Sequence, residues 1–171
     1  MTAPPRDDDD FAGAGAAPGR IKGRCVGHRV TIEAPPELVW DFIADFEGWG
    51  SWNPLYTQTA GAAEPGATIR FTVAVPGLKP HKGSAEVYAV RQNELLEYGV
   101  SSLGGMLKAL RFVELDEISP TRCAVANAEI MGGPVGLLLS RTVGERVRQG
   151  LEAMNLALKA VAERKWRGRP A

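Results

Sequence analysis

The sequence of 171 residues predicts a single α+β domain in which seven antiparallel strands precede one long C-terminal helix. Two observations predict this class. Short runs of alternating apolar and polar residues recur between turn-forming residues over most of the chain. After the last run, about thirty residues without proline carry an apolar stripe at helical spacing. The short, regular spacing of the strands is typical of a meander rather than of a parallel sheet.

The first strand and the helix after it follow from residues 29–46. Val30 and Ile32 alternate with polar neighbours, which is the pattern of a half-buried strand. Pro36 has a fixed φ that suits the first turn of a helix, and an apolar stripe at three- and four-residue spacing follows it. The stripe consists of Leu38, Val39, Phe42, Ile43 and Phe46.

An aromatic corner separates this helix from the other strands. Gly48 and Gly50 end the helix, and Trp49, Trp52 and Pro54 form the corner. Turn-forming residues then divide the chain into six further candidate strands. These are expected near Leu55–Ala60, Thr68–Val75, Lys82–Arg91, Leu95–Ser101, Leu107–Ile118 and Arg122–Met131.

The C-terminal helix is the longest predicted element. No proline occurs from Val135 to about Arg164, which predicts a helix about 45 Å long. Apolar residues recur along it at intervals of three and four and predict one continuous buried seam. The seam comprises Val143, Val147, Leu151, Met154, Leu158 and Val161.

The two ends of the chain are predicted to be tails around a domain that spans residues 20–166. Residues 1–19 are rich in Ala, Gly, Pro and Asp and are expected to be disordered. They contain no apolar segment long enough for a signal peptide, and the apolar run at 135–139 is too short to span a bilayer. A cytoplasmic location is therefore expected.

The charge pattern limits the partners. The formal net charge is zero, which does not suggest a nucleic-acid partner. Residues 167–171 form a basic tail, and the basic end from Arg164 to Arg169 includes Trp166. Transient contact with an anionic membrane and a frayed helix end are both open readings of this segment, and the second is the more common.

Templates for metal or nucleophilic chemistry are missing from the sequence. His28 and His81 are the only histidines, and together with Cys25 and Cys123 they have no metal-ligand spacing. No Gly-x-Ser-x-Gly elbow and no phosphate-binding loop occurs. We therefore expect neither a metal nor another cofactor.

Two pieces of the sequence carry a resemblance to a known superfamily. Residues 34–46, followed by Trp49-x-x-Trp52-Asn-Pro54, resemble the first strand, the paired short helices and the start of the second strand of the START-like superfamily, also called SRPBCC or Bet v 1-like. Residues 120–132 resemble its last strand before the closing helix. The resemblance covers about residues 24–164 and is to the polyketide cyclase/dehydrase and lipid-transport branch.

This resemblance implies a helix-grip fold. In such a fold a curved antiparallel sheet wraps around a long C-terminal helix, two short helices lie between strands 1 and 2, and a cavity lies between sheet and helix. If the family's pairing of the first and last strands holds, Cys25 and Cys123 begin strands at opposite ends of the sheet. We therefore predict two thiols without a disulfide.

The resemblance also favours a pocket for an apolar guest over a solid interior. For each candidate lining residue the alternative is an ordinary core position. The candidates are Trp52, Tyr56, Phe71, Val73, Tyr88, Tyr98, Phe112, Leu151 and Met154. Arg111 and Glu129 either form a buried polar anchor in this pocket or are two surface charges on an exposed sheet face, and strand alternation leaves both open.

The preferred function is the binding of a small hydrophobic molecule, such as a lipid, quinone, isoprenoid or polyketide-like compound, for sequestration or transport. One alternative is an enzyme of the polyketide cyclase or dehydratase type that uses the same cavity. Its candidate proton-transfer groups are Tyr56, Tyr88, Tyr98, Arg111 and Glu129. Another alternative is a protein-interaction module. The sequence assigns no oligomeric state.

Overall fold

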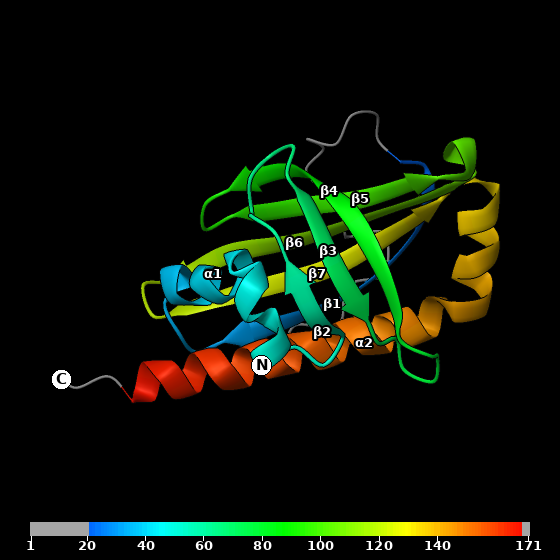
Figure 1. Ribbon diagram of the computed structural model, residues 1–171. Helices are drawn as coiled ribbons and strands as arrows, with labels where there is room; N and C mark the ends of the chain where they lie inside the picture. Colours follow the sequence, from blue (N-terminus) through cyan, green and yellow to red (C-terminus); the bar gives the residue numbers. More distant parts are fainter. Residues whose placement is uncertain (1–20, 169–171) are drawn as a thin grey trace.

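A computed structural model describes residues 21–168. The expected disordered tail, residues 1–19, and the last residues of the basic tail, 169–171, lie outside this part of the chain. Within it, one curled sheet lies over a long helix (Figure 1).

The sheet has seven strands in the order β1-β7-β6-β5-β4-β3-β2, and all neighbours are antiparallel. The predicted antiparallel meander is therefore confirmed, with β1 closing onto β7. Each of the six strands after β1 begins and ends within two residues of its predicted limits, and β1 contains the predicted alternation of Val30 and Ile32. The strands are β1 (Gly23–Ile32), β2 (Tyr56–Ala60), β3 (Thr68–Val73), β4 (His81–Arg91), β5 (Leu95–Ser102), β6 (Leu107–Ser119) and β7 (Arg122–Gly132).

Two short helices follow β1, as the resemblance implied. The first, α1 (Pro36–Ala44), begins at the predicted proline but ends before Phe46. The chain then tightens into a 3-10 helix, η2 (Phe46–Ser51), whose start is capped where Asp45 Oδ1 accepts a hydrogen bond from the Gly48 amide at 3.1 Å. A further 3-10 turn, η3 (Leu103–Gly105), joins β5 to β6.

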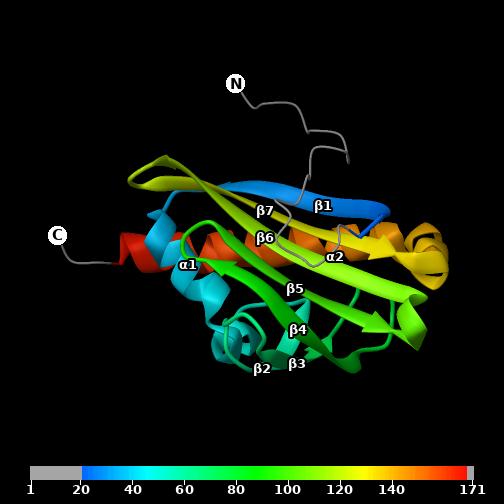
Figure 2. The ribbon, with the colours of Figure 1, turned by 90° about the horizontal axis from the view of Figure 1, so that it is seen from above.

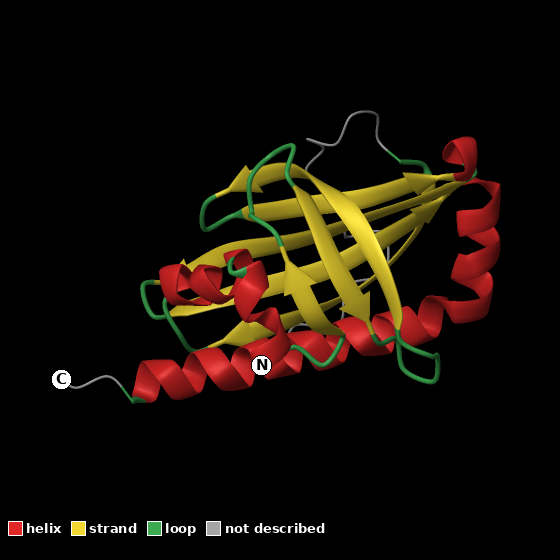
Figure 3. Ribbon diagram, viewed as in Figure 1, coloured by secondary structure: helices red, strands yellow, loops and turns green. Residues whose placement is uncertain are grey.

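The C-terminal helix α2 (Gly133–Arg167) is bent. Figures 1 and 3 show its first part turning sharply away from the long remainder, a bend that the apolar spacing of the sequence did not indicate. Near this bend Ser140 Oγ donates to the carbonyl oxygen of Leu137 at 2.7 Å, and Thr142 Oγ1 donates to that of Leu139 at 3.1 Å. Hydroxyl groups that bond back to helical carbonyls favour bending, and Gly144 adds local freedom.

The remainder of α2 crosses the concave face of the sheet and packs against β1 and β7 (Figure 2). Four of the six predicted seam residues are buried there: Val147, Leu151, Met154 and Leu158. Val143 and Val161, at the two ends of the seam, are half-buried. The seam therefore holds helix and sheet together along most of its length, as predicted.

Aromatic side chains fill the end of the concave face next to η2. The Trp49 ring is fully buried and lies 5.4 Å from the Tyr56 ring and 6.3 Å from the Tyr98 ring, between centroids. Phe46 meets Tyr98 edge to face at 5.9 Å. Such edge-to-face contacts are favourable for aromatic pairs, so this end of the domain is solid.

The two cysteines form no disulfide, as predicted. Cys25 pairs in register with Ile130, whereas Cys123 pairs with Ile32, so the two lie towards opposite ends of the β1–β7 ladder. Burial, together with the nearby carboxylates of Glu33 and Glu37, raises the pKa of Cys123 to about 11. This thiol is therefore protonated and unreactive at neutral pH.

Candidate functional site

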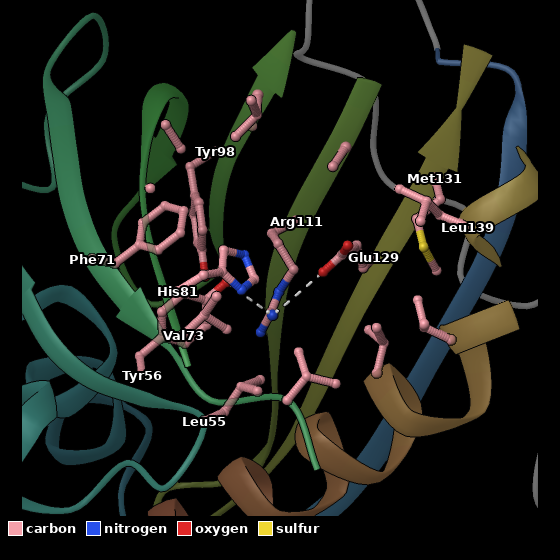
Figure 4. A pocket seen from close by; sticks show the side chains of 18 of the residues that line it. Leu55, Tyr56, Phe71, Val73, His81, Tyr98, Arg111, Glu129, Met131 and Leu139 are labelled. Atoms are coloured by element: carbon pink, nitrogen blue, oxygen red, sulfur yellow. Dashed lines mark hydrogen bonds and ion pairs between the residues drawn. The ribbon is translucent and has the colours of Figure 1, made fainter. Parts of the chain in front are cut away.

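A cavity of about 510 Å³ lies between the concave face of the sheet and the first half of α2 (Figure 4). This volume is within the range of pockets for small organic molecules. Apolar side chains from β3 to β7, from the loop between β3 and β4 and from α2 form most of the wall, including Val73, Val75, Leu107, Ala109, Met131, Leu139, Val143 and Val147.

One ion pair lies in this apolar wall. Arg111 of β6 and Glu129 of β7 are direct partners in the antiparallel register, and Nη1 of Arg111 lies 3.6 Å from Oε2 of Glu129. Figure 4 shows both side chains directed into the cavity. Arg111 is only 4 % exposed. Of the two readings that the sequence left open, the structure therefore places these charges on the concave face rather than on an exposed one.

Two tyrosines surround the guanidinium. Nη1 of Arg111 donates a hydrogen bond to the Tyr56 hydroxyl at 3.1 Å. The guanidinium carbon also lies 5.1 Å from the Tyr56 ring centroid and 6.0 Å from that of Tyr98, which are cation–π distances. The positive charge is thus held by one carboxylate, one hydroxyl and two aromatic faces.

A chain of side-chain amides supports the guanidinium from behind. Nη2 of Arg111 donates to Asn127 Oδ1 at 3.0 Å, and Asn127 Nδ2 in turn contacts Met154 Sδ at 3.2 Å and Asn155 Oδ1 at 3.4 Å. Asn155 Nδ2 donates to the backbone oxygen of His28 at 2.8 Å. Both asparagines are fully buried. The network therefore links β6, β7, α2 and β1 and fixes the position of Arg111.

Burial sets the ionisation of these groups. Desolvation raises the pKa of Glu129, and the charge of Arg111 opposes this shift. Desolvation also works against the charge of Arg111, but Tyr56, Tyr98 and Glu129 outweigh it, so its pKa is raised overall and it stays charged. The pKa values of Tyr56 and Tyr98 are raised by burial, with Arg111 opposing, so both phenols are neutral at physiological pH.

Six of the predicted lining residues contribute to the cavity wall. They are Tyr56, Phe71, Val73, Tyr98, Arg111 and Glu129. Their role in binding a ligand stays a prediction. Three residues of α2 also line the cavity without having been predicted to do so: Leu139, Val143 and Val147. The spacing of Val143 and Val147 indicates only a buried seam, and Leu139 lies before that seam.

Phe112 and Tyr88 do not line the cavity. Phe112 follows Arg111 in a regular strand and so faces the convex side, where it packs in a separate cluster with Leu95 and Ala128. Tyr88 lies at a register shift in β4 and packs over Gly99, since a Cβ added there would be 2.8 Å from Tyr88 Cε2. Alternation therefore excludes Phe112 once Arg111 faces inwards.

Leu151 and Met154 belong to the core, Trp52 packs against it, and none of the three lines the cavity. Trp52 packs edge to face on Trp49 and Phe42. Leu151 and Met154 come after Gly150, where the helix approaches the segment before β2 so closely that an added Cβ would be 2.8 Å from Leu55 Cδ1. The cavity ends there, and Met154 contacts the polar network instead of an open space.

The role of Asn127 and Asn155 in the polar network was not predicted from the sequence. A signal for Asn155 was present, because it lies four residues after Leu151 and three before Leu158, inside the predicted seam. A polar residue at a seam position needs a buried partner. Asn127 shares its strand face with Glu129, so its orientation was predictable once that face was known.

The described part of the chain, residues 21–168, has no helix long and apolar enough to cross a bilayer. The same part contains no group of three or more His, Cys, Asp or Glu side chains placed to hold a metal ion.

Solved structures show which class of fold this is. The Zhui aromatase/cyclase from Streptomyces sp. R1128 is 19 % identical, with a TM-score of 0.68 over 85 % of this chain and 96 % of that chain. A START superfamily protein from Mycobacterium smegmatis is 18 % identical, with a TM-score of 0.66 over 82 % and 98 %. Norcoclaurine synthase from Thalictrum is 13 % identical, with a TM-score of 0.62 over 86 % and 99 %. At these identities the likeness defines a START-like helix-grip fold.

The sequence also matches a protein family over residues 24–163, which is most of the chain. The protein belongs to the polyketide cyclase/dehydrase and lipid transport family. A search of the curated proteins found no significant match. The predicted superfamily and branch are thereby confirmed.

Proposed function

We propose that this protein binds a small hydrophobic molecule, of the lipid, quinone, isoprenoid or polyketide-like kind, for sequestration or transport. The observation that carries the proposal is the cavity of about 510 Å³, which has apolar walls and one polar cluster around Arg111. Binding in an apolar cavity is favourable because it removes apolar surface of the ligand from water, and a few polar groups orient the bound ligand. A protein-interaction module would not need such a space.

Part of the cavity wall is exposed to solvent, so a ligand can enter the cavity from outside. Leu78 and Leu139 line the cavity and are 40 % and 39 % exposed. Leu78 lies in the loop between β3 and β4, and Leu139 lies in the first part of α2. The ligand is expected to pass between these two elements.

Native mass spectrometry of the purified protein tests this proposal, together with organic extraction and mass analysis of the extract. Displacement of a fluorescent lipid by candidate compounds then measures affinity. We expect a stoichiometric bound molecule or saturable displacement at one site. Protein that carries no ligand and displaces nothing over a broad panel of apolar compounds would contradict the proposal.

A cyclase or dehydratase is the second candidate, and a specific observation favours it. Arg111 connects two other polar groups of the cavity wall: its Nη1 atom lies 3.6 Å from Oε2 of Glu129 and 3.1 Å from the Tyr56 hydroxyl. A carboxyl group with a raised pKa can transfer protons, and a guanidinium can stabilise a developing enolate. Aromatase/cyclases among the structural neighbours support this reading.

The test of this second candidate is turnover of a linear poly-β-ketone, followed by mass spectrometry for loss of water. Glu129→Gln keeps the size of the side chain and removes its proton-transfer capacity. If the protein is an enzyme of this kind, the variant binds the substrate but turns it over at least about a hundredfold more slowly. Binding without turnover by the unaltered protein would leave only the carrier function.

A further inference from the structure

The polar cluster in the cavity wall is electrically balanced. Glu129 lies 3.6 Å from Arg111 and is its counter-ion. The other groups that contact the guanidinium are neutral: the hydroxyl of Tyr56, the rings of Tyr56 and Tyr98, the amide of Asn127 and the sulfur of Met154. A charged ligand group that enters here therefore meets a site whose charge is already compensated.

Nothing else in the described wall compensates a second negative charge. Arg111 is the one Lys or Arg among the described residues that line the cavity. His81 of β4 also lines it but is exposed to solvent. The wall residues of α2, Leu139, Val143 and Val147, carry no titratable group. A carboxylate placed beside Glu129 would be a second buried anion in an apolar space.

The cluster nevertheless has donor capacity left. A guanidinium has five N–H donors, and the hydrogen bonds of Arg111 within the described chain use Nη1 and Nη2. Nε is buried without a hydrogen-bond partner in the same part of the chain. An uncharged oxygen acceptor satisfies such a cluster without adding charge to it.

We propose that the cavity selects uncharged hydrophobic molecules that carry a carbonyl or quinone oxygen, and rejects the matching carboxylates. The inference rests on the proposed ligand-binding function and names the chemical class of the ligand. Arg111 holds the ligand oxygen, and Glu129 excludes the anion. Cations are excluded by Arg111 itself.

The test compares two probes of nearly the same shape, 2-acetylnaphthalene and 2-naphthoate, by isothermal titration calorimetry at about pH 8. We expect the ketone to bind the unaltered protein at least about tenfold more tightly than the carboxylate. Binding of the carboxylate should be coupled to proton uptake, because either Glu129 or the probe must be protonated in the complex. The difference in affinity between the ketone and the carboxylate should therefore become smaller as the pH is lowered. Proton uptake is read from titrations in buffers with different ionisation enthalpies.

Glu129→Gln is the decisive variant, since it removes the negative charge but keeps the shape of the side chain. In this variant the ratio of the two affinities should fall below about threefold through tighter binding of the carboxylate. Equal binding of both probes by the unaltered protein at about pH 8 would overturn the inference while leaving the carrier function intact. A ratio unchanged in Glu129→Gln would also overturn it. If neither probe binds, the inference is overturned. The proposed carrier function is then judged by its own test, the search for a ligand that co-purifies with the protein.

Discussion

Asn155 of α2 holds His28 of β1 through two contacts. Its Nδ2 atom lies 2.8 Å from the His28 backbone oxygen and 3.1 Å from the ring atom Nδ1. Since an amide nitrogen only donates, this geometry requires Nδ1 to accept and therefore to be unprotonated. The same asparagine accepts a hydrogen bond from Asn127, so the half-buried histidine is connected to the cavity network.

Replacing Asn155 with leucine should lower the free energy of unfolding by about 1–3 kcal/mol, because buried donors and acceptors on Asn127 and His28 lose their partner. Chemical denaturation followed by circular dichroism measures this change. Leu156→Ala is the matched control on the same helix, since Leu156 is 50 % exposed, and should change stability by less than about 0.5 kcal/mol. Equal effects of the two substitutions would show that the network contributes nothing.

His28 should make the protein less stable in mild acid. Burial lowers the pKa of its ring, Glu152 opposes this shift, and Arg148 adds to it. A histidine whose pKa is lower in the folded state binds protons more tightly when unfolded, so stability is lost as the pH falls below the ordinary value of about 6.5. Thermal unfolding at about pH 5.5 and pH 7.5 measures this loss.

His28→Gln should reduce that pH dependence, whereas His81→Gln, at an exposed position, serves as the control. A pH profile that is unchanged by His28→Gln would show that other groups carry the acid sensitivity.

Arg111→Met should destabilise the protein by about 3–5 kcal/mol at neutral pH, because it leaves the Glu129 carboxylate buried without its counter-ion. Removing Arg111 also removes the interaction that lowers the pKa of Glu129, so this pKa rises further above its ordinary value. For an acid with a raised pKa in the folded state, the stability present at low pH is lost as the pH rises. The defect should therefore be larger at about pH 8 than at about pH 5.

The double variant Arg111→Met with Glu129→Gln should recover part of the loss, since neither of these two positions then carries a buried charge. Denaturation curves of the two single variants and the double variant give the coupling between the residues. Additive losses, with no difference between the two pH values, would contradict a buried ion pair at this place.

The strands β2 to β7 and their meander were predictable because each strand is short, alternates and ends at a turn. The pairing of β1 with β7 was implied by the family resemblance instead. The bend in α2 was not, because it depends on where Ser140 and Thr142 direct their hydroxyls and on what the helix meets after β7. Apolar spacing alone describes a stripe on a helix and does not describe whether that helix is straight.

The candidate site was predicted in part for a similar reason. Alternation shows which residues of a strand share a face, so Arg111 and Phe112 could not both line the cavity, but it does not show which face is concave. Along α2 the predicted seam is buried for most of its length, but the seam does not show where the cavity lies. The cavity lies beside Val143 and Val147 and ends near Gly150. That boundary depends on the approach of Leu55 from another part of the chain, which no local pattern records.

The position of the cavity along the helix leads to the last prediction. Val143 lies in the wall beside the open space and is only half-buried, so a larger side chain there can extend into the cavity without displacing packed neighbours. Val143→Trp should weaken binding of the displaced fluorescent lipid at least about tenfold, with a change in unfolding free energy below about 1.5 kcal/mol. Leu138→Trp places the same side chain on the same part of α2 at a position that is 63 % exposed, and it should leave binding unchanged. If Val143→Trp binds as well as the unaltered protein while remaining folded, the ligand occupies some other part of the molecule.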